Sequence, residues 1–213
     1  MKKLHLEVLN KKQKEVLPQL SFLKNFYLAG GTALALQIGH ITSVDFNFYT
    51  PKHFDAKKLY QEIEKVFGKR VVKTGDDEDT LFGTINEVSV SFFWYKHKLI
   101  KKPKKIMGVR VACMEDVAAM KLIAISYRPK ERDYIDIYYL LKTLSLKEMF
   151  SLVSKKYPNF NQYYTIRALG YFDDIKEEDK RPIKVFDPEF SWEAAKKKIF
   201  EEVKKYQLAM IKK

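Results

Sequence analysis

Residues 26–36 read FYLAGGTALAL, a short apolar run followed by two glycines and then by residues that favour a helix. The pattern predicts a strand, a tight turn and a helix, with Thr32 as the N-cap of that helix. Glycines let backbone amides approach a ligand, and the first amides of a helix are unpaired donors with partial positive charge. The segment could therefore bind phosphate, although on its own it is more typical of an ordinary capped turn.

A second candidate strand begins at Val44, twelve residues after Thr32. Because side chains alternate along a strand, Asp45 and Asn47 should share one face while apolar residues occupy the other. Two acids at this spacing can hold a divalent metal beside a triphosphate, where the metal activates an attacking hydroxyl and stabilises the leaving pyrophosphate. Only one of the two is an acid here, since the second position is the amide Asn47.

The rest of the first half alternates short strands with helices. We expect helices at 11–24, 32–39 and 55–67, and strands at 26–29, 44–49, 70–73, 80–85 and 88–95. Residues 79–95 are predicted to form a hairpin that turns at Asn86 and Glu87. Residues 96–108 contain six lysines and are predicted to be a basic, solvated loop.

The periodicity of apolar residues changes near Cys113, after which helices are expected at 115–128, 131–142, 146–156, 161–170 and 191–207. We therefore predict an α+β protein with a small mixed-sheet core at 1–113 and a helical region at 114–213 packed on it. Cys113 is the single cysteine, which excludes an internal disulfide and favours a reducing compartment. It is expected to be buried in a strand.

The formal net charge of +13 favours a polyanionic partner such as nucleic acid. Lysine supplies most of this charge, so binding should involve phosphates rather than base edges and should depend on salt. The alternative is the ordinary charged surface of a heat-tolerant protein. The sequence shows neither a signal peptide nor eighteen consecutive apolar residues, which predicts a cytoplasmic protein with no membrane partner.

Three ordered motifs resemble the AbiEii/AbiGii toxin-type family of the polymerase-β-like nucleotidyltransferases. The first comprises LAGGTALALQ at 28–37, Gly39-His40 and SVDF at 43–46. The others are EDVAAMKL at 115–122 and RDYIDIYYLL at 132–141. The resemblance extends from about residue 20 to beyond 170 and implies a small mixed β-sheet nucleotidyltransferase core flanked by helices.

The resemblance also implies an activity and partners. It implies metal-dependent transfer of a nucleotide from a nucleoside triphosphate, with Mg²⁺ or Mn²⁺, to an RNA such as tRNA or to a protein acceptor. Some family members are toxins of toxin–antitoxin pairs, so an antitoxin protein is an expected partner. The roles implied for individual residues are phosphate binding by Gly30, Gly31 and Thr32, metal binding by Asp45 with Asn47, triphosphate binding by Lys121, and an acid from 132–136.

The residues of the helical half support some of these roles independently. Lys121 falls within the apolar arc of its predicted helix, and Arg128 lies two turns further along the same face, so the two could bind phosphate. The alternative is a snorkelling lysine and an arginine at a helix C-terminus. Asp133 and Asp136 share a helix face, and either could pair with Arg132 or Lys130. We prefer Asp136 for the site because Asp133 is a favourable first-turn acid.

Two positions depart from the family pattern, which usually has an acid at Asn47 and a basic residue at Ile41. An amide coordinates metal through its carbonyl but adds no charge, so weaker metal binding is expected. The later strand offers Ser89 and Ser91 on one face and no carboxylate. The alternative functions are therefore a catalytically impaired nucleotide- or RNA-binding module with the same fold, and a basic RNA- or antitoxin-binding protein without a nucleotide site.

Two further features have competing interpretations. His40 could contact a phosphate or a base, but after Gly39 it is expected to begin the loop that leaves a helix. The aromatic residues at 92–95 and at Tyr163 and Tyr164 could stack on bases, but their spacing favours packing in the core.

Overall fold

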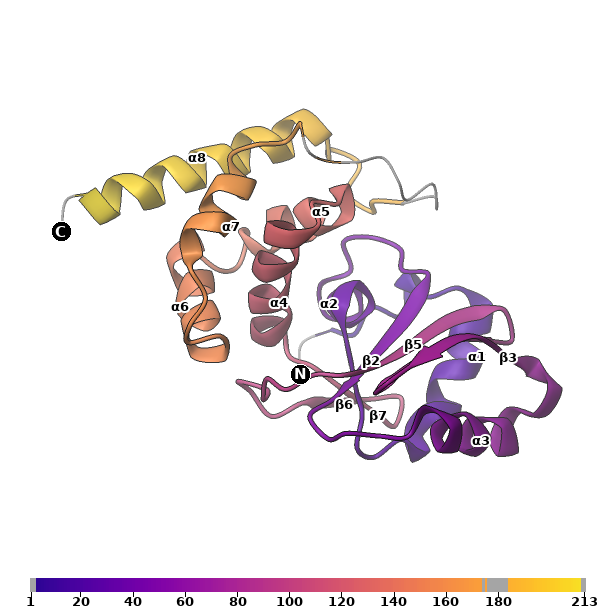
Figure 1. The fold of residues 1–213 in the computed structure, drawn as a ribbon. Coiled ribbons are helices and arrows are strands. Elements are labelled where there is room, and N and C mark those ends of the chain that lie inside the picture. The colour runs from indigo at the N-terminus through magenta and orange to yellow at the C-terminus, as the bar shows by residue number, and fades with distance from the viewer. Residues whose placement is uncertain (1–2, 174, 176–183, 212–213) are drawn as a thin grey trace. The chain divides into compact units, whose positions relative to one another are not determined.

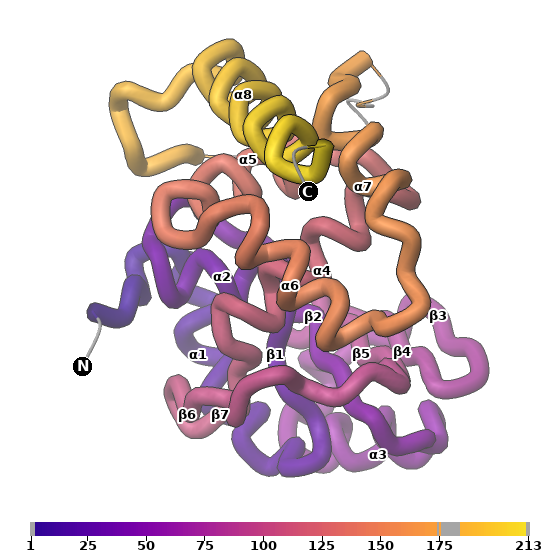
Figure 2. Tube along the Cα trace, turned by 90° about the vertical axis from the view of Figure 1, so that its left-hand side faces the viewer, coloured from indigo at the N-terminus to yellow at the C-terminus, as the bar shows by residue number. Residues whose placement is uncertain are grey.

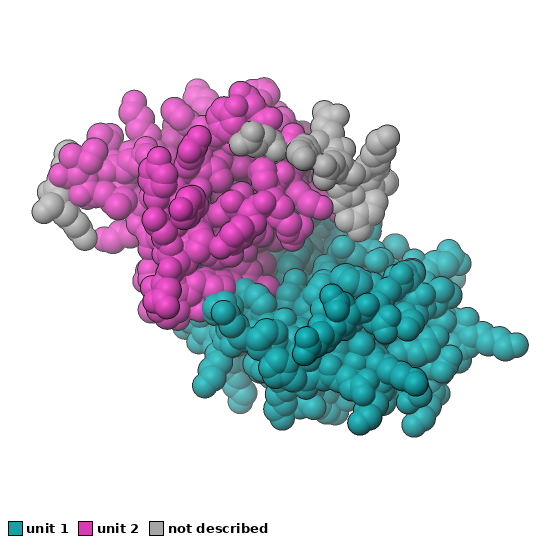
Figure 3. All heavy atoms as spheres, viewed as in Figure 1, with its two compact units in different colours: residues 1–113 teal, residues 114–213 magenta. Residues whose placement is uncertain are grey.

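The computed structural model describes residues 3–173, 175 and 184–211. It divides into two compact units, Met1–Cys113 and Met114–Lys213 (Figure 3). Unit 1 combines a sheet with helices, and the described part of unit 2 is built from helices (Figure 1). The chain is therefore an α+β protein, as predicted.

Within the described residues, unit 1 is built on a mixed seven-stranded sheet with the order β3-β4-β5-β2-β1-β7-β6. β2 runs parallel to β5 and β1 runs parallel to β7, while the remaining neighbours are antiparallel. The strands are β1 Tyr27–Ala29, β2 Asp45–Thr50, β3 Val71–Asp77, β4 Thr80–Ile85, β5 Val88–Trp94, β6 Lys104–Ile106 and β7 Val109–Val111.

Three α-helices of unit 1 pack against this sheet: α1 Lys11–Gln19, α2 Gly30–Ile38 and α3 Ala56–Phe67. The predicted helix 11–24 is too long, because α1 ends at Gln19 and a 3-10 turn follows at Leu20–Phe22. Phe46, Phe48 and Phe92 are fully buried at the centre of the core, and the rings of Phe48 and Phe92 stack with centroids 5.3 Å apart. The apolar face of β2 thus anchors the sheet.

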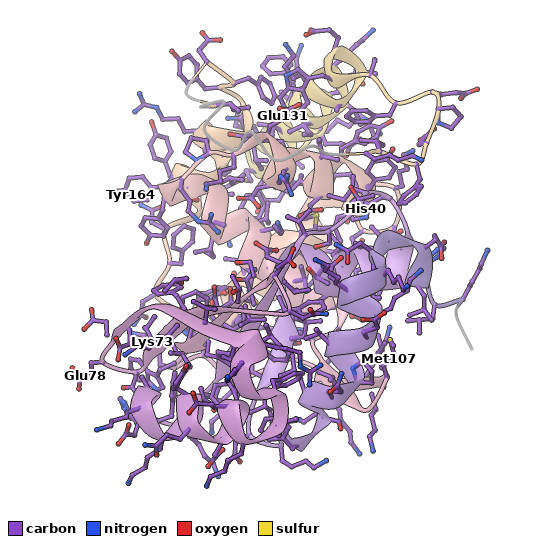
Figure 4. All side chains as sticks on the ribbon, turned by 90° about the vertical axis from the view of Figure 1, so that its right-hand side faces the viewer. His40, Lys73, Glu78, Met107, Glu131 and Tyr164 are labelled. Atoms are coloured by element: carbon purple, nitrogen blue, oxygen red, sulfur yellow. The ribbon has the colours of Figure 1, made fainter. Side chains whose placement is uncertain are left out.

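Three hairpins turn through residues in the left-handed region, and in the first of them Asp79, with φ of 53°, joins β3 to β4. Asn86 and Glu87, with φ of 50° and 65°, join β4 to β5 as predicted. Met107 and Gly108, with φ of 49° and 84°, join β6 to β7 (Figure 4). The prediction of a loop over 96–108 was therefore wrong at its end, because the lysine-rich strand β6 lacks the alternation that marks a strand and is held by pairing with β7.

Cys113 is buried as predicted, but it does not lie in a strand. It follows β7, in the connection to the first helix of unit 2, and its thiol donates a hydrogen bond to the Lys102 carbonyl at 3.2 Å.

The helices of unit 2 are α4 Met114–Tyr127, α5 Glu131–Leu140, α6 Leu146–Lys156, α7 Gln162–Leu169 and α8 Trp192–Ile211. Most bounds differ from the prediction by one or two residues, whereas α8 continues four residues beyond 207. α4 is central, because α5, α6 and α7 all pack against it (Figure 2). No helix in the described part of the chain is long and apolar enough to cross a membrane.

The prediction that the aromatic residues pack in the core holds for Phe92 but is wrong for Trp94, which is exposed at the end of β5, and for Tyr163 and Tyr164. Phe92 is fully buried, whereas Tyr163 and Tyr164 are 61% and 60% exposed. The prediction failed because α7 turns Thr165 and Ile166, rather than the two tyrosines, toward the interior of unit 2.

Candidate functional site

The turn between β1 and α2 is formed by the glycines themselves. α2 begins at Gly30, whose φ is 73°, and Ala29 is the N-cap without a side-chain cap. The expectation that Thr32 caps this helix was wrong, because the glycines already occupy its first turn and Thr32 lies inside it. The first amides of a helix have no partner within it, so Gly30, Gly31 and Thr32 present donors at a position that suits an anion.

The buried side chain of Thr32 has a different task. Its hydroxyl donates a hydrogen bond to the backbone carbonyl of Asp45 and is also hydrogen-bonded to the hydroxyl of Ser43. Because the Thr32 proton is used on the carbonyl, the Ser43 hydroxyl must be the donor in the second bond. Thr32 thus fastens the first turn of α2 to the start of β2.

Asp45 and Asn47 share the partly exposed face of β2, as predicted. The strand alternates regularly, with Phe46 and Phe48 fully buried on the opposite face. In the parallel pairing with β5, Asp45 is in register with Ser89 and Asn47 with Ser91. Since side chains in register point to the same side of a sheet, one carboxylate, one amide and two hydroxyls line a single face.

This polar face lies next to the glycine turn. Asn47 pairs with Ala29 in the antiparallel β1–β2 ladder, and a Cβ added to Gly30 would lie 3.9 Å from the Asn47 side-chain nitrogen. The helix start and the Asp45–Asn47 pair are therefore neighbours within unit 1. This arrangement could hold an anionic ligand at the amides with a cation beside it.

The two departures from the expected pattern lie in different surroundings. Asn47 is on the polar face, where its amide oxygen could act as a metal ligand. Ile41 is 3% exposed, so its side chain belongs to the apolar interior. His40 is buried directly after Gly39, which ends α2 in the left-handed region with φ of 67°, so this histidine does begin the loop that leaves the helix.

Lys121 of unit 2 is held by two acids of α5. Its ammonium donates a hydrogen bond to Asp133 Oδ1 at 2.6 Å and forms an ion pair with Asp136. Burial favours the neutral amine, but the two carboxylates outweigh this effect and raise the pKa of Lys121 above its ordinary value. Lys121 is therefore a permanent cation, and it is buried rather than extended to solvent as a snorkelling lysine would be.

Asp133 and Asp136 thus pair with Lys121, a partner that was not considered for them in the sequence. Lys130 and Arg132 were considered because they are close in the chain, whereas the pairing across α4 and α5 depends on how the helices pack. Lys121, Asp133 and Asp136 form what we call the α4–α5 charge cluster.

Arg128 lies in different surroundings from Lys121. It is exposed and directly follows the last residue of α4, with its backbone amide bonded to the carbonyl of Ala124 at 2.9 Å. The alternative interpretation, an arginine at a helix C-terminus, describes this position correctly.

A second buried ion pair joins α4 to α6 and was missed. The Lys156 ammonium donates to Asp116 Oδ1 at 2.7 Å, and both side chains are completely buried. Burial lowers the pKa of Lys156 from its ordinary value, although the bond to Asp116 opposes the effect. Asp116 lies beside Val117 on the buried side of α4. An acid among the apolar residues of a predicted helix was the feature of the sequence that could have indicated a buried ion pair.

The described residues contain no group of three or more His, Cys, Asp or Glu side chains that could hold a metal ion. The polar face of β2 offers the Asp45 carboxylate and the Asn47 amide oxygen, beside the Ser89 and Ser91 hydroxyls of β5.

Comparison with known proteins identifies the family. Residues 95–210 match the model of the nucleotidyl transferase AbiEii toxin of type IV toxin–antitoxin systems. This chain belongs to the AbiEii family. The AbiEii match covers unit 2 and the end of unit 1, so the glycine turn and the polar face of β2 lie outside it and are described by the geometry above.

Individual proteins are also similar to this chain. The chain is 35% identical over 207 residues to the uncharacterized protein aq_aa25 of Aquifex aeolicus strain VF5, covering 93% of this chain and 97% of that protein. Its fold is similar to that of a proposed nucleotidyltransferase from H. pylori, with a TM-score of 0.55, 14% identity, and coverage of 98% of this chain and 95% of the other.

The fold is also similar to that of MenT4, the nucleotidyltransferase toxin Rv2826c from Mycobacterium tuberculosis H37Rv. The TM-score is 0.54 at 16% identity, over 91% of this chain and 82% of MenT4. At such identities these two structures establish the fold.

Proposed function

We propose that this AbiEii-family chain is a metal-dependent nucleotidyltransferase that transfers a nucleotide from a nucleoside triphosphate to an RNA acceptor such as tRNA, as the toxin of a cytoplasmic toxin–antitoxin pair. The observation that carries the proposal is the placement of Asp45 and Asn47 on one face of β2, beside the glycine turn that begins α2.

The donor set of the polar face fits a hard divalent cation. Mg²⁺ is usually held by one or two carboxylates together with substrate phosphates, and it accepts amide oxygens. The Asp45 carboxylate and the Asn47 amide oxygen would hold Mg²⁺ or Mn²⁺. The metal would polarise the attacking hydroxyl and neutralise charge on the phosphates.

The chain's own residues would position the reactants. The amides of Gly30, Gly31 and Thr32 bind phosphate oxygens, and the Thr32 hydrogen bonds keep that turn beside Asp45. The acceptor hydroxyl oxygen forms a bond to the α-phosphorus while the bond between the α-phosphorus and the bridging oxygen breaks. Pyrophosphate leaves, and the hydroxyl proton is released to solvent.

The roles of Lys121, Arg128 and Asp136 stay predictions. The Lys121 ammonium has three donors, two of which are directed at carboxylates, so one is left for a triphosphate oxygen. Asp136 would then act through Lys121 by fixing its position and charge. Arg128 is exposed and would meet phosphate as a charged rim residue.

A second candidate function has its own supporting observation. The residues aligned with Asp45 and Asn47 on β5 are Ser89 and Ser91, so Asp45 is the single carboxylate among these four side chains. A site with so little negative charge could bind a nucleotide without efficient catalysis, as an impaired nucleotide- or RNA-binding module.

The test is incorporation of each α-labelled nucleoside triphosphate into purified total tRNA, with Mg²⁺ and with Mn²⁺. We expect label transfer by the unaltered protein and none by Asp45→Ala. Glu62→Ala, which removes an exposed acid from α3, is the matched control and should transfer normally. Equal transfer by Asp45→Ala would refute the proposed site, and nucleotide binding without transfer would favour the module.

A further inference from the structure

Three tyrosines on α4 and α7 carry their rings into solvent. Tyr127 is 76% exposed, Tyr163 is 61% exposed and Tyr164 is 60% exposed. Tyr164 projects outward from its helix (Figure 4). Aromatic rings are normally used to bury apolar area, so several exposed rings on one small region indicate a binding surface.

The packing of α4 against α7 brings together the backbone stretches that carry these rings. The Ser126 and Thr165 hydroxyls are 2.7 Å apart, and Thr165 also donates to the Leu122 carbonyl at 3.2 Å. Because Tyr127 follows Ser126 and Tyr164 precedes Thr165, the rings leave neighbouring stretches of backbone. The Phe160 ring lies 6.4 Å from that of Tyr127 and extends the group. We call Tyr127, Phe160, Tyr163 and Tyr164 the tyrosine surface.

Two exposed arginines lie close in the chain to these rings. Arg128 directly follows Tyr127, and Arg167 lies one turn after Tyr163 and Tyr164 on α7; both arginines are exposed. Arg167 is the single charged residue between Tyr157 and Tyr171. The surface thus combines flat rings, which stack on any base, with guanidinium groups, which bind phosphate.

We propose that the tyrosine surface binds the single-stranded end of the RNA acceptor, with bases stacked on the rings and phosphates bound by Arg128 and Arg167. The choice of RNA rests on the proposed function. A chain with a net charge of +13 attracts a polyanion, and interleaved rings and arginines match a strand of unpaired bases better than the aliphatic surface of a protein partner. A duplex hides its base faces and cannot stack in this way.

The proposal is tested by binding alone. Anisotropy of a labelled single-stranded oligoribonucleotide is measured with the full chain and with the double variant Tyr163→Ala/Tyr164→Ala. Losing stacked bases should weaken binding roughly tenfold or more. The double variant Tyr163→Phe/Tyr164→Phe keeps the rings and should bind normally. Phe200→Ala removes a comparably exposed ring, 52% exposed on α8, and should have no effect.

Charge and strand dependence complete the test. Arg167→Gln should reduce the slope of log affinity against log salt by about 0.7, as expected for one lost phosphate contact to a single strand. A labelled RNA duplex should bind more weakly than the single strand, because its base faces are hidden. The proposal fails if the double alanine variant binds the single strand as tightly as the unaltered chain does, or if Phe200→Ala weakens binding as much as the double alanine variant. It also fails if the duplex binds as tightly as the single strand.

Failure of the surface can be distinguished from failure of the proposed function. Asp45→Ala should retain RNA binding while losing transfer. Binding that depends on the tyrosines in a chain that transfers no nucleotide would refute the proposed function and leave the surface intact. If transfer depends on Asp45 but RNA binding does not depend on the tyrosines, the tyrosine surface is refuted and the proposed function stands.

Discussion

The Thr32 hydroxyl donates a hydrogen bond to the backbone carbonyl of Asp45 and thereby joins the turn that would bind phosphate to the strand that would bind metal. Thr32→Val keeps the shape but removes the hydroxyl that bonds the Asp45 carbonyl and the Ser43 hydroxyl. We expect a loss of about 1–3 kcal/mol in the free energy of unfolding, measured with urea. Thr32→Ser should restore most of it, and a fully stable valine variant would show that the bond is unimportant.

Adding a carboxylate at Asn47 should strengthen metal binding. In Asn47→Asp two acids lie side by side on one face of β2 and repel each other. The metal-free variant should therefore be less stable than the unaltered chain at neutral pH, and Mg²⁺ should stabilise it more. We expect the affinity for Mg²⁺ to rise about tenfold. The measurement is the dependence of the melting temperature, and of nucleotide transfer, on the Mg²⁺ concentration. Asn25→Asp, at an exposed position of unit 1, controls for added charge. An equal response in both variants would contradict the site.

Removing one charged residue from the α4–α5 charge cluster should destabilise the protein. Lys121→Met leaves Asp133 and Asp136 buried without their cation, and we expect a loss of about 3–5 kcal/mol in the free energy of unfolding. The triple variant Lys121→Met/Asp133→Asn/Asp136→Asn removes all the charges together and should recover much of that loss in urea unfolding. Similar instability in both variants would show that packing, not charge, is responsible.

The same triple variant separates a structural role of Lys121 from a catalytic one. If Lys121 binds the triphosphate, the folded triple variant should transfer nucleotide more slowly and show a raised KM for the nucleoside triphosphate. Normal transfer by a stable triple variant would assign the cluster to joining α4 and α5 alone.

Asp79, in the turn between β3 and β4, should make the stability of unit 1 depend on acid. The backbone amide of Phe54 donates to Asp79 Oδ1 at 2.6 Å and His53 bonds the other oxygen, and both lower the pKa of Asp79. Because the pKa of Asp79 is lower in the folded state than in the unfolded state, the ionised carboxylate stabilises the folded protein at pH values above the ordinary carboxyl pKa. This contribution to the free energy of unfolding is lost as the pH falls through the pKa of the folded state. Asp79→Asn should therefore be less stable at neutral pH, and urea unfolding curves of the two proteins should converge toward low pH. A constant difference would contradict the assignment.

The sequence predicted what local patterns determine. The alternation of Asp45, Phe46 and Asn47 gave the two faces of β2, and Asn86 with Glu87 gave the hairpin between β4 and β5, because each depends on neighbouring residues. The family motifs identified the AbiEii family and with it the α+β fold.

The features that the sequence did not reveal depend on contacts between distant segments. The partners of Lys121 lie 12 and 15 positions along the chain on another helix, and the Asp116–Lys156 pair spans 40 positions. The short strands β6 and β7 have too few residues for a readable alternation and exist through pairing with each other and with β1. Tyr163 and Tyr164 were assigned to the core because helical spacing alone does not say which side of α7 is covered.

The pairing of β7 with β1 should also protect the chain against self-association. β1 directly precedes the glycine turn. Without β7, the backbone donors and acceptors on one side of β1 would form an open sheet edge, to which another extended chain could add. β6 closes the sheet with Lys104 and Lys105, whose charges discourage a further strand from adding there. A fragment that ends before Lys104 would retain Asp45 and the glycines, yet we expect it to aggregate, so the strands of the proposed site should stay in solution only together with the hairpin that follows them.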